Sequence, residues 1–170
     1  MAVDRSLIGR STGLRRVVVE RGPVAVFAEA VKDHDPVYQD ADAAREAGFP
    51  SVPVPPTFPF VMAHWGALAE LQPRGAGGQG ETALLEVLAP LLRAGGLLLH
   101  GEQEFEYHSP IVVGDVLTGE GRVTDVYEKQ APGAAMTFVL TETTWRHDPG
   151  GEVAVVARSS ALVRLPRAGS

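Results

Sequence analysis

Residues 57–71 read TFPFVMAHWGALAEL, and the architecture of the chain depends on this segment. Thr57 and Pro59 suit a first helical turn, because proline's missing N–H has no intrahelical partner there anyway. The pattern predicts a helix that is buried on most sides, because apolar residues surround it almost completely at positions 58, 61, 62, 65, 68, 69 and 71.

Strand patterns account for most of the chain after residue 97. Proline and glycine separate the runs at Pro110 and Gly114, at residues 132–133 and at residues 149–151. A shorter β-branched run at residues 14–20 adds a fifth strand near the amino terminus. The four later strands are predicted over residues 100–108, 115–128, 134–146 and 152–165. Long consecutive strands of this kind favour a curved antiparallel sheet.

The amino-terminal half alternates short helical patterns with stiff connections. Residues 23–33 and 40–48 each predict a short helix, and five prolines make residues 49–59 an extended link. Residues 81–93 are leucine-rich but interrupted by Pro90, so they predict a short helix or part of a lid. The whole order predicts an α+β protein whose five-stranded antiparallel sheet wraps round the helix at residues 57–71.

Composition excludes several classes of function. The chain has 170 residues, 45% of them hydrophobic and 21% charged, which is typical of one globular domain. A formal net charge of −6 argues against nucleic acid or an anionic membrane as main partner. Cysteine is absent, and residues 1–10 lack the apolar block of a signal peptide, so we expect a cytoplasmic protein.

An acidic turn at residues 31–40 lies between the two short helices. Asp33, Asp35 and Tyr38 surround Pro36, and ionisable groups on a stiff turn suit proton transfer. The alternative is structural, because aspartate often bonds its own backbone in turns and tyrosine often packs with its hydroxyl bonded. The sequence leaves both interpretations open.

Four segments cover most of the chain in order: DRSLIGR at 4–10, DHDPVY at 33–38, VPPTF at 54–58 and HGEQEFEYHSPIVVGD at 100–115. On these segments the chain resembles the MaoC-like acyl dehydratases, or (R)-specific enoyl hydratases, which have the hot dog fold. It is most similar to the amino-terminal-type domain of mycobacterial (3R)-hydroxyacyl-acyl carrier protein dehydratase subunits. The resemblance implies one such domain over residues 1–170.

This resemblance implies (R)-specific hydration or dehydration of 2-enoyl and 3-hydroxyacyl thioesters, with no cofactor. The family places Asp, any residue, Asn, Pro, an apolar residue and His on the acidic turn. Asp33 and Pro36 match, Asp35 replaces the asparagine, and Tyr38 replaces the catalytic histidine. Tyrosine, with a pKa of about 10, is a poor base at neutral pH, so Tyr38 would orient water unless His34 substitutes for it.

Two function classes therefore stay open, with a thioesterase as a weaker third. In one, a homodimer hydrates enoyl thioesters of coenzyme A or acyl carrier protein, with Asp33 as base. In the other, the chain binds the acyl tail while a MaoC-like partner subunit supplies the Asp–His pair. Open sheet edges predict a dimer in either case. The resemblance implies these substrate-binding residues: Pro56, Thr57, Phe58, Val61, His64, Trp65 and His100.

Two remaining features predict less. Residues 73–80 are glycine-rich, but their spacing does not match a nucleotide-binding motif. His100 and His108 are eight residues apart, so on a regular strand they would share a face with Glu102, Glu104 and Glu106. The two histidines would be about 26 Å apart, too far to share a metal, so we predict no metal site.

Overall fold

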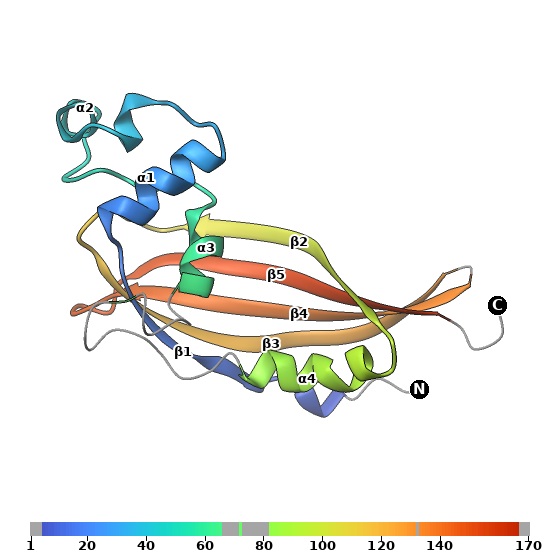
Figure 1. Cartoon of the computed structure of the whole chain (residues 1–170). Helices are drawn as coiled ribbons and strands as arrows, with labels where there is room; N and C mark the ends of the chain where they lie inside the picture. Colours follow the sequence, from blue (N-terminus) through green and yellow to red (C-terminus); the bar gives the residue numbers. More distant parts are fainter. Residues whose placement is uncertain (1–4, 66–71, 73–81, 132, 167–170) are drawn as a thin grey trace.

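The computed structural model describes residues 5–65, 72, 82–131 and 133–166. The chain follows an α+β order in which helices precede four long strands (Figure 1). The elements are η1 (Arg5–Leu7), β1 (Ser11–Val18), α1 (Arg21–Ala30), η2 (Pro36–Tyr38), α2 (Ala41–Glu46), α3 (Phe58–Trp65), α4 (Thr82–Arg93), β2 (Leu97–Tyr107), β3 (Val116–Ala131), β4 (Ala134–His147) and β5 (Val153–Pro166).

All five strands form one antiparallel sheet in the order β1-β3-β4-β5-β2. The predicted sheet is therefore confirmed. Strands β3, β4 and β5 are joined by two successive hairpins, whereas β1 and β2 are the two edges. In the part of the chain that the structure describes, each edge strand pairs with one neighbour, so the outer backbone groups of β2 have no partner strand there.

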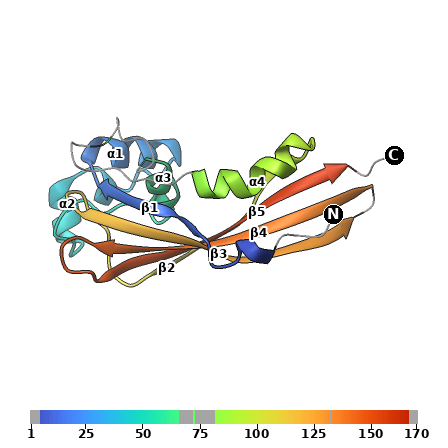
Figure 2. The ribbon, with the colours of Figure 1, turned by 90° about the horizontal axis from the view of Figure 1, so that it is seen from below.

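The helices α1, α3 and α4 lie on the same side of the twisted sheet (Figure 2). Helix α4 is continuous through Pro90, which lies in its last turn, and it packs against β1 and β5. The segment at residues 81–93 is therefore a helix, as one of the two alternatives predicted. Among the described residues, no helix is long and apolar enough to cross a bilayer.

Helix α3 begins at Phe58, with Pro59 in its first turn, as predicted. Phe58, Pro59 and Met62 are buried, but Phe60 is 42% exposed and His64 is exposed. One side of the described part of the helix is therefore open in the single chain. Residues 66–71, the second half of the predicted helix, and the glycine-rich segment at 73–80 lie outside the described residues.

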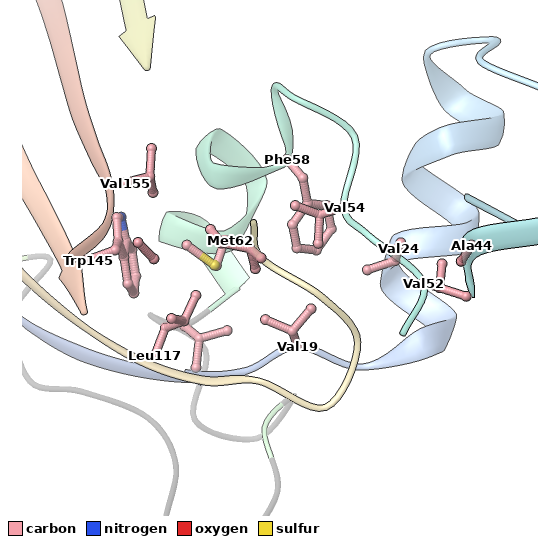
Figure 3. Packing of buried hydrophobic residues seen from close by; sticks show 13 residues of the cluster. Val19, Val24, Ala44, Val52, Val54, Phe58, Met62, Leu117, Trp145 and Val155 are labelled. Atoms are coloured by element: carbon pink, nitrogen blue, oxygen red, sulfur yellow. The ribbon is translucent and has the colours of Figure 1, made fainter. Parts of the chain in front are cut away.

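Two separate hydrophobic clusters line the inner face of the sheet, the face that the helices cover. The larger cluster joins α1, α3 and the residues before α3 to one end of the sheet, through Val24, Val54, Met62 and Trp145 (Figure 3). The smaller cluster lies under α4 and contains Leu88, Val123, Val126, Val139 and Val163. Of the buried residues that the structure describes, none belongs to both clusters.

A bulge divides β2 into two halves. Its pairing with β5 shifts between His100 and Gln103, so side chains after the bulge alternate in the opposite phase. His100 accordingly contacts Phe60 of α3, whereas His108 lies beside Glu106, 3.5 Å from its carboxylate. The prediction that His100 and His108 share a face is therefore wrong, because it assumed a regular strand.

Glutamates of β2 instead join an ion-pair network on the outer face of the sheet. Arg158 of β5 donates to Glu104, Glu106 and Glu142 at 3.1, 2.9 and 3.0 Å. Arg122 of β3 donates to Glu142 as well, at 2.8 Å. The hydrogen bond from Arg122, with that from Arg158, lowers the pKa of Glu142 below its ordinary value.

Candidate functional site

The acidic turn starts where α1 ends. The N–H of Asp33 donates to Ala28 and that of Lys32 donates to Glu29, which is the Schellman arrangement at a helix end. Lys32 occupies the left-handed position with φ 58°, where glycine is usual. The conformation of Lys32 sets the direction in which the backbone leaves α1 and therefore the position of Asp33.

The short helix η2 follows, and hydrogen bonds to its backbone hold it in place. Asp35 caps it by accepting the N–H of Val37 at 2.9 Å, and Pro36 fills its first position. Arg21 of α1 donates to the carbonyls of Tyr38, at 3.0 Å, and Gln39. Asp33 also accepts a backbone hydrogen bond, from the N–H of Asp35 at 3.3 Å. Both aspartates therefore stabilise the turn through the backbone.

Tyr38 lies in a cluster of acidic groups. Partial burial, followed by the charges of Asp33 and Asp35, raises its pKa above the ordinary value. Tyr107 of β2 lies close enough to Tyr38 to be affected by it, and burial together with Tyr38 raises the Tyr107 pKa strongly. The Tyr107 hydroxyl donates to the Pro56 carbonyl at 3.0 Å. Both phenols therefore keep their protons at neutral pH and can act only as donors or water-orienting groups.

His34 does not join this cluster. Its Nδ1 lies 3.4 Å from Glu29, and 65% of its side chain is exposed. Neighbouring residues on a turn project in different directions, and here Asp33 is half-buried while His34 faces solvent. A substitution of His34 for the family histidine would therefore require the turn to rearrange.

A pocket of about 490 Å³ lies between α3, α4 and the inner face of the sheet. Its mouth is apolar and aromatic: the Phe60 ring centroid lies 5.0 Å from that of His64 and 5.5 Å from that of His100. Leu98 and Leu99 of the edge strand β2 continue this wall. A cavity of this size and lining suits an apolar chain.

The floor of the pocket is polar. It is formed by a belt of five side chains that crosses the sheet between the two hydrophobic clusters: Thr12, Gln103, Thr141, Thr143 and Ser159, hereafter the polar belt. Two of these bond each other, since the Thr141 and Ser159 hydroxyls lie 2.8 Å apart. Gln103 donates to the carbonyl of Arg158 at 2.9 Å. The sequence contained a signal for part of this belt, because Thr141 and Thr143 alternate in phase with buried Val139 and Trp145.

The structure brings together only part of the predicted site. His64 and His100 line the pocket, as does Phe60, whereas Asp33, His34 and Tyr38 do not. Phe58 packs in the larger cluster, edge to face with Phe27. The remaining predicted binding residues do not line the pocket; the first two precede α3 and the last two lie within it: Pro56, Thr57, Val61 and Trp65.

One polar cluster escaped sequence analysis altogether. Ser109 Oγ lies 3.0 Å from His147 Nε2, and Asp115 Oδ2 lies 3.7 Å from His147 Nδ1. The second distance exceeds a hydrogen bond, and Asp115 instead accepts the Val112 N–H at 2.8 Å. The cluster joins the connection between β2 and β3 to the last residue of β4, away from the pocket. Within the described ranges, no three His, Asp or Glu side chains gather as metal ligands.

Comparisons with known proteins agree with this architecture. A family model described as "FAS1-like, dehydratase domain region" matches residues 6–156. A UPF0336 protein of Thermobifida fusca is 32% identical over 165 residues, which cover 96% of this chain and 95% of that protein. A "Probable enoyl-CoA hydratase alpha subunit" of Thermomonospora curvata is 31% identical over 144 residues, which cover 83% of this chain and 43% of that protein.

Solved structures show the same fold. The ChsH1-ChsH2 complex from Mycobacterium tuberculosis contains a chain with a TM-score of 0.72 at 23% identity, covering 94% of this chain and 86% of that one. The HadBC (3R-hydroxyacyl-ACP dehydratase) complex from the same organism gives 0.67 at 22% identity, covering 92% and 96%. The chain therefore belongs to the family of FAS1-like dehydratase regions and has the hot dog fold of the MaoC-like dehydratases.

Proposed function

We propose that this chain is the acyl-binding subunit of a two-subunit hydratase or dehydratase that acts on 2-enoyl and 3-hydroxyacyl thioesters with (R) stereochemistry. The observation that carries the proposal is the tyrosine at position 38. Tyr38 replaces the family's histidine, and burial with two neighbouring carboxylates raises its pKa, so it cannot accept a proton at neutral pH. The chain retains a largely apolar pocket for a tail but lacks the usual base.

The edge strand β2 is the surface through which a partner would complete the site. Leu97, Leu98 and Leu99 are 56%, 42% and 39% exposed along this edge. A second curved sheet that pairs with β2 would satisfy the open backbone groups and cover these leucines. Leu98 and Leu99 also line the pocket, so the partner would lie against its mouth. Both solved structures reported above are complexes of two different chains.

In this arrangement the chemistry takes place on the partner's side. During hydration, the partner's Asp–His pair removes a proton from water, the water oxygen bonds to C3 of the enoyl thioester, and C2 receives a proton. The present chain holds the acyl tail in position and excludes water from it. Asp33 then shapes the turn by accepting the N–H of Asp35, and the Tyr38 hydroxyl can donate a hydrogen bond.

A second candidate is catalysis by this chain alone. The observation that favours it is Asp33, which is half-buried and electrostatically coupled to Tyr38. Asp33 would act as the base, with Tyr38 orienting water or returning a proton through its hydroxyl.

Hydration of crotonyl-CoA and of a longer enoyl-CoA distinguishes the two candidates. We expect the purified chain to be inactive, and activity to appear on mixing with a MaoC-like chain that carries the Asp–His pair. In that mixture Asp33→Asn should retain most of the activity, as should the matched control Asp42→Asn, whose side chain is 83% exposed in α2. Turnover by the chain alone that Asp33→Asn abolishes and Asp42→Asn preserves would refute the proposal in favour of the second candidate.

A further inference from the structure

The polar belt is unusual because it interrupts the inner face of the sheet where a core is normally apolar. Hydrophobic clusters lie on either side of it, yet its members are hydroxyl and amide side chains that line the pocket. A tail made only of methylene groups would cover these polar groups without bonding them, which is unfavourable. The belt therefore suits a ligand that itself carries a polar atom.

The hydroxyls of Thr12 and Thr143 and the indole N–H of Trp145 make no hydrogen bond to another described side chain. Trp145 is 0% exposed, lines the pocket, and its Nε1 has no partner among the described residues. Thr12 is only 5% exposed, and neither it nor Thr143 bonds another described side chain through its hydroxyl. By contrast, Gln103, Thr141 and Ser159 are already bonded.

The two hydroxyls point toward one region. A Cβ added to Gly121 would lie 3.0 Å from Thr143 Oγ1 and closer still to Thr12 Oγ1, so both hydroxyls lie over the same glycine. In Trp145, the carbons Cδ2, Cε3 and Cζ3 lie over Gly119 of β3. The opposite edge of the indole, which carries Nε1, therefore lies toward Val155 of β5 (Figure 3), so it does not share the region of the two hydroxyls over β3.

The type of these groups indicates the type of ligand atom. An indole N–H can only donate, and a threonine hydroxyl can donate as well. An acceptor oxygen that reaches the two threonines can accept from both hydroxyls. Because the thioester of the proposed substrate belongs at the partner's Asp–His pair, the oxygen at the polar belt must belong to the tail.

We propose that the preferred substrate is an acyl thioester whose tail carries an acceptor oxygen, such as a ketone, which is bound by Thr143 and Thr12. This inference rests on the proposed acyl-binding function and makes it more specific. Thr143 lies on β4, two strands across the sheet from β2, or about 10 Å, which separates the tail oxygen from Tyr107 and the acidic turn.

The test compares affinities by calorimetry on the full chain. The probes are dodecanoyl-CoA and a set of oxo analogues of the same length with the ketone at successive carbons. We expect one analogue to bind about tenfold more tightly than dodecanoyl-CoA, and the others to show no such gain, because the floor lies at one depth. Equal affinity of all the probes would overturn this inference and leave acyl binding intact. No binding of any probe would overturn the proposed function itself.

Variants then assign the preference to the floor. The measured quantity is the ratio of the two dissociation constants, for dodecanoyl-CoA and for the best oxo analogue. Thr143→Val and Thr12→Val keep side-chain volume and should bring this ratio toward one. Thr144→Val is the matched control, because the next residue of β4 faces the other side of the sheet and does not line the pocket. A ratio that Thr143→Val and Thr12→Val leave unchanged would refute the assignment.

Discussion

Gly119 of β3 supports the large ring of the core, and its replacement by alanine tests the packing directly. Trp145 on the neighbouring strand lies across this glycine, and their backbones are directly paired. An added Cβ would lie 2.7 Å from the indole carbons Cε3 and Cζ3 and 2.8 Å from Cδ2. Cβ atoms in folded proteins essentially never approach other heavy atoms closer than 3.0 Å. The ring or the strand must therefore move.

The expected cost follows from how little room the ring has. Trp145 is 0% exposed and packs in the larger hydrophobic cluster, so it cannot swing into solvent. Overpacking a close-packed core by one methyl group costs about 1–3 kcal/mol. The smaller conformational freedom of alanine in the unfolded chain returns about 0.4–1 kcal/mol. We expect Gly119→Ala to lower the free energy of unfolding by about 1–2 kcal/mol.

Equilibrium unfolding in urea, followed by tryptophan fluorescence at fixed protein concentration, measures this change. A loss of this size corresponds to a midpoint lower by about 0.5–1 M for a urea slope of about 2 kcal/mol per molar. Gly22→Ala in the first turn of α1 is the control, because no heavy atom lies within 4 Å of its added Cβ. Unfolding of Gly119→Ala at the same or a higher urea concentration than Gly22→Ala would contradict the steric conflict between the added Cβ and Trp145.

Three further changes test the site and the outer face. Lys32→Gly should raise the free energy of unfolding by about 0.5–1 kcal/mol in thermal melts, because glycine adopts the left-handed conformation without a Cβ clash; a lower stability would contradict the strain at this residue. Asp33→Asn should lower the pKa of Tyr38 in a phenolate absorbance titration but leave it above the ordinary value, because burial is the larger cause; an unchanged titration would show that Asp33 does not act on it. Glu142→Gln should lower the free energy of unfolding by about 1 kcal/mol at pH 7, because the pKa of Glu142 is lower in the folded than in the unfolded chain. The contribution of Glu142 to stability is present above the unfolded-state pKa and is lost as the pH falls through the folded-state pKa. Urea midpoints of wild type and Glu142→Gln should therefore converge in acid, and a constant difference at all pH values would contradict the ion pairing.

Local patterns were enough to predict most of the fold. Strands β3, β4 and β5 are bounded by proline and glycine, so their ends could be placed within a few residues. The errors fall where local patterns conflict with pairing. Strand β1 begins at Ser11, before the predicted run, because its pairing with β3 shifts between Ser11 and Gly13. Strand β2 begins at Leu97, before the predicted start at residue 100. Residues 97–99 are a continuous apolar run, so they lack the alternation by which a strand is identified in sequence.

The two parts of the site differ in how far sequence could predict them. The acidic turn is local, so Asp33, Pro36 and Tyr38 could be placed together from their spacing alone. The pocket is not local, because its walls come from two helices and the inner face of the sheet and depend on strand register. A one-residue bulge in β2 decides that His100 faces the pocket, and no single-sequence pattern located that bulge.

The separation of the two hydrophobic clusters has a consequence for how the molecule responds to its ligand. Among the described residues, the polar belt lies between the two clusters on the inner face of the sheet. The pocket touches both ends, through Leu88 on one side and Trp145 on the other. A bound tail would therefore act as a missing piece of core. We expect a bound tail to slow amide hydrogen exchange most at mid-strand, and the occupied protein to unfold as one cooperative body.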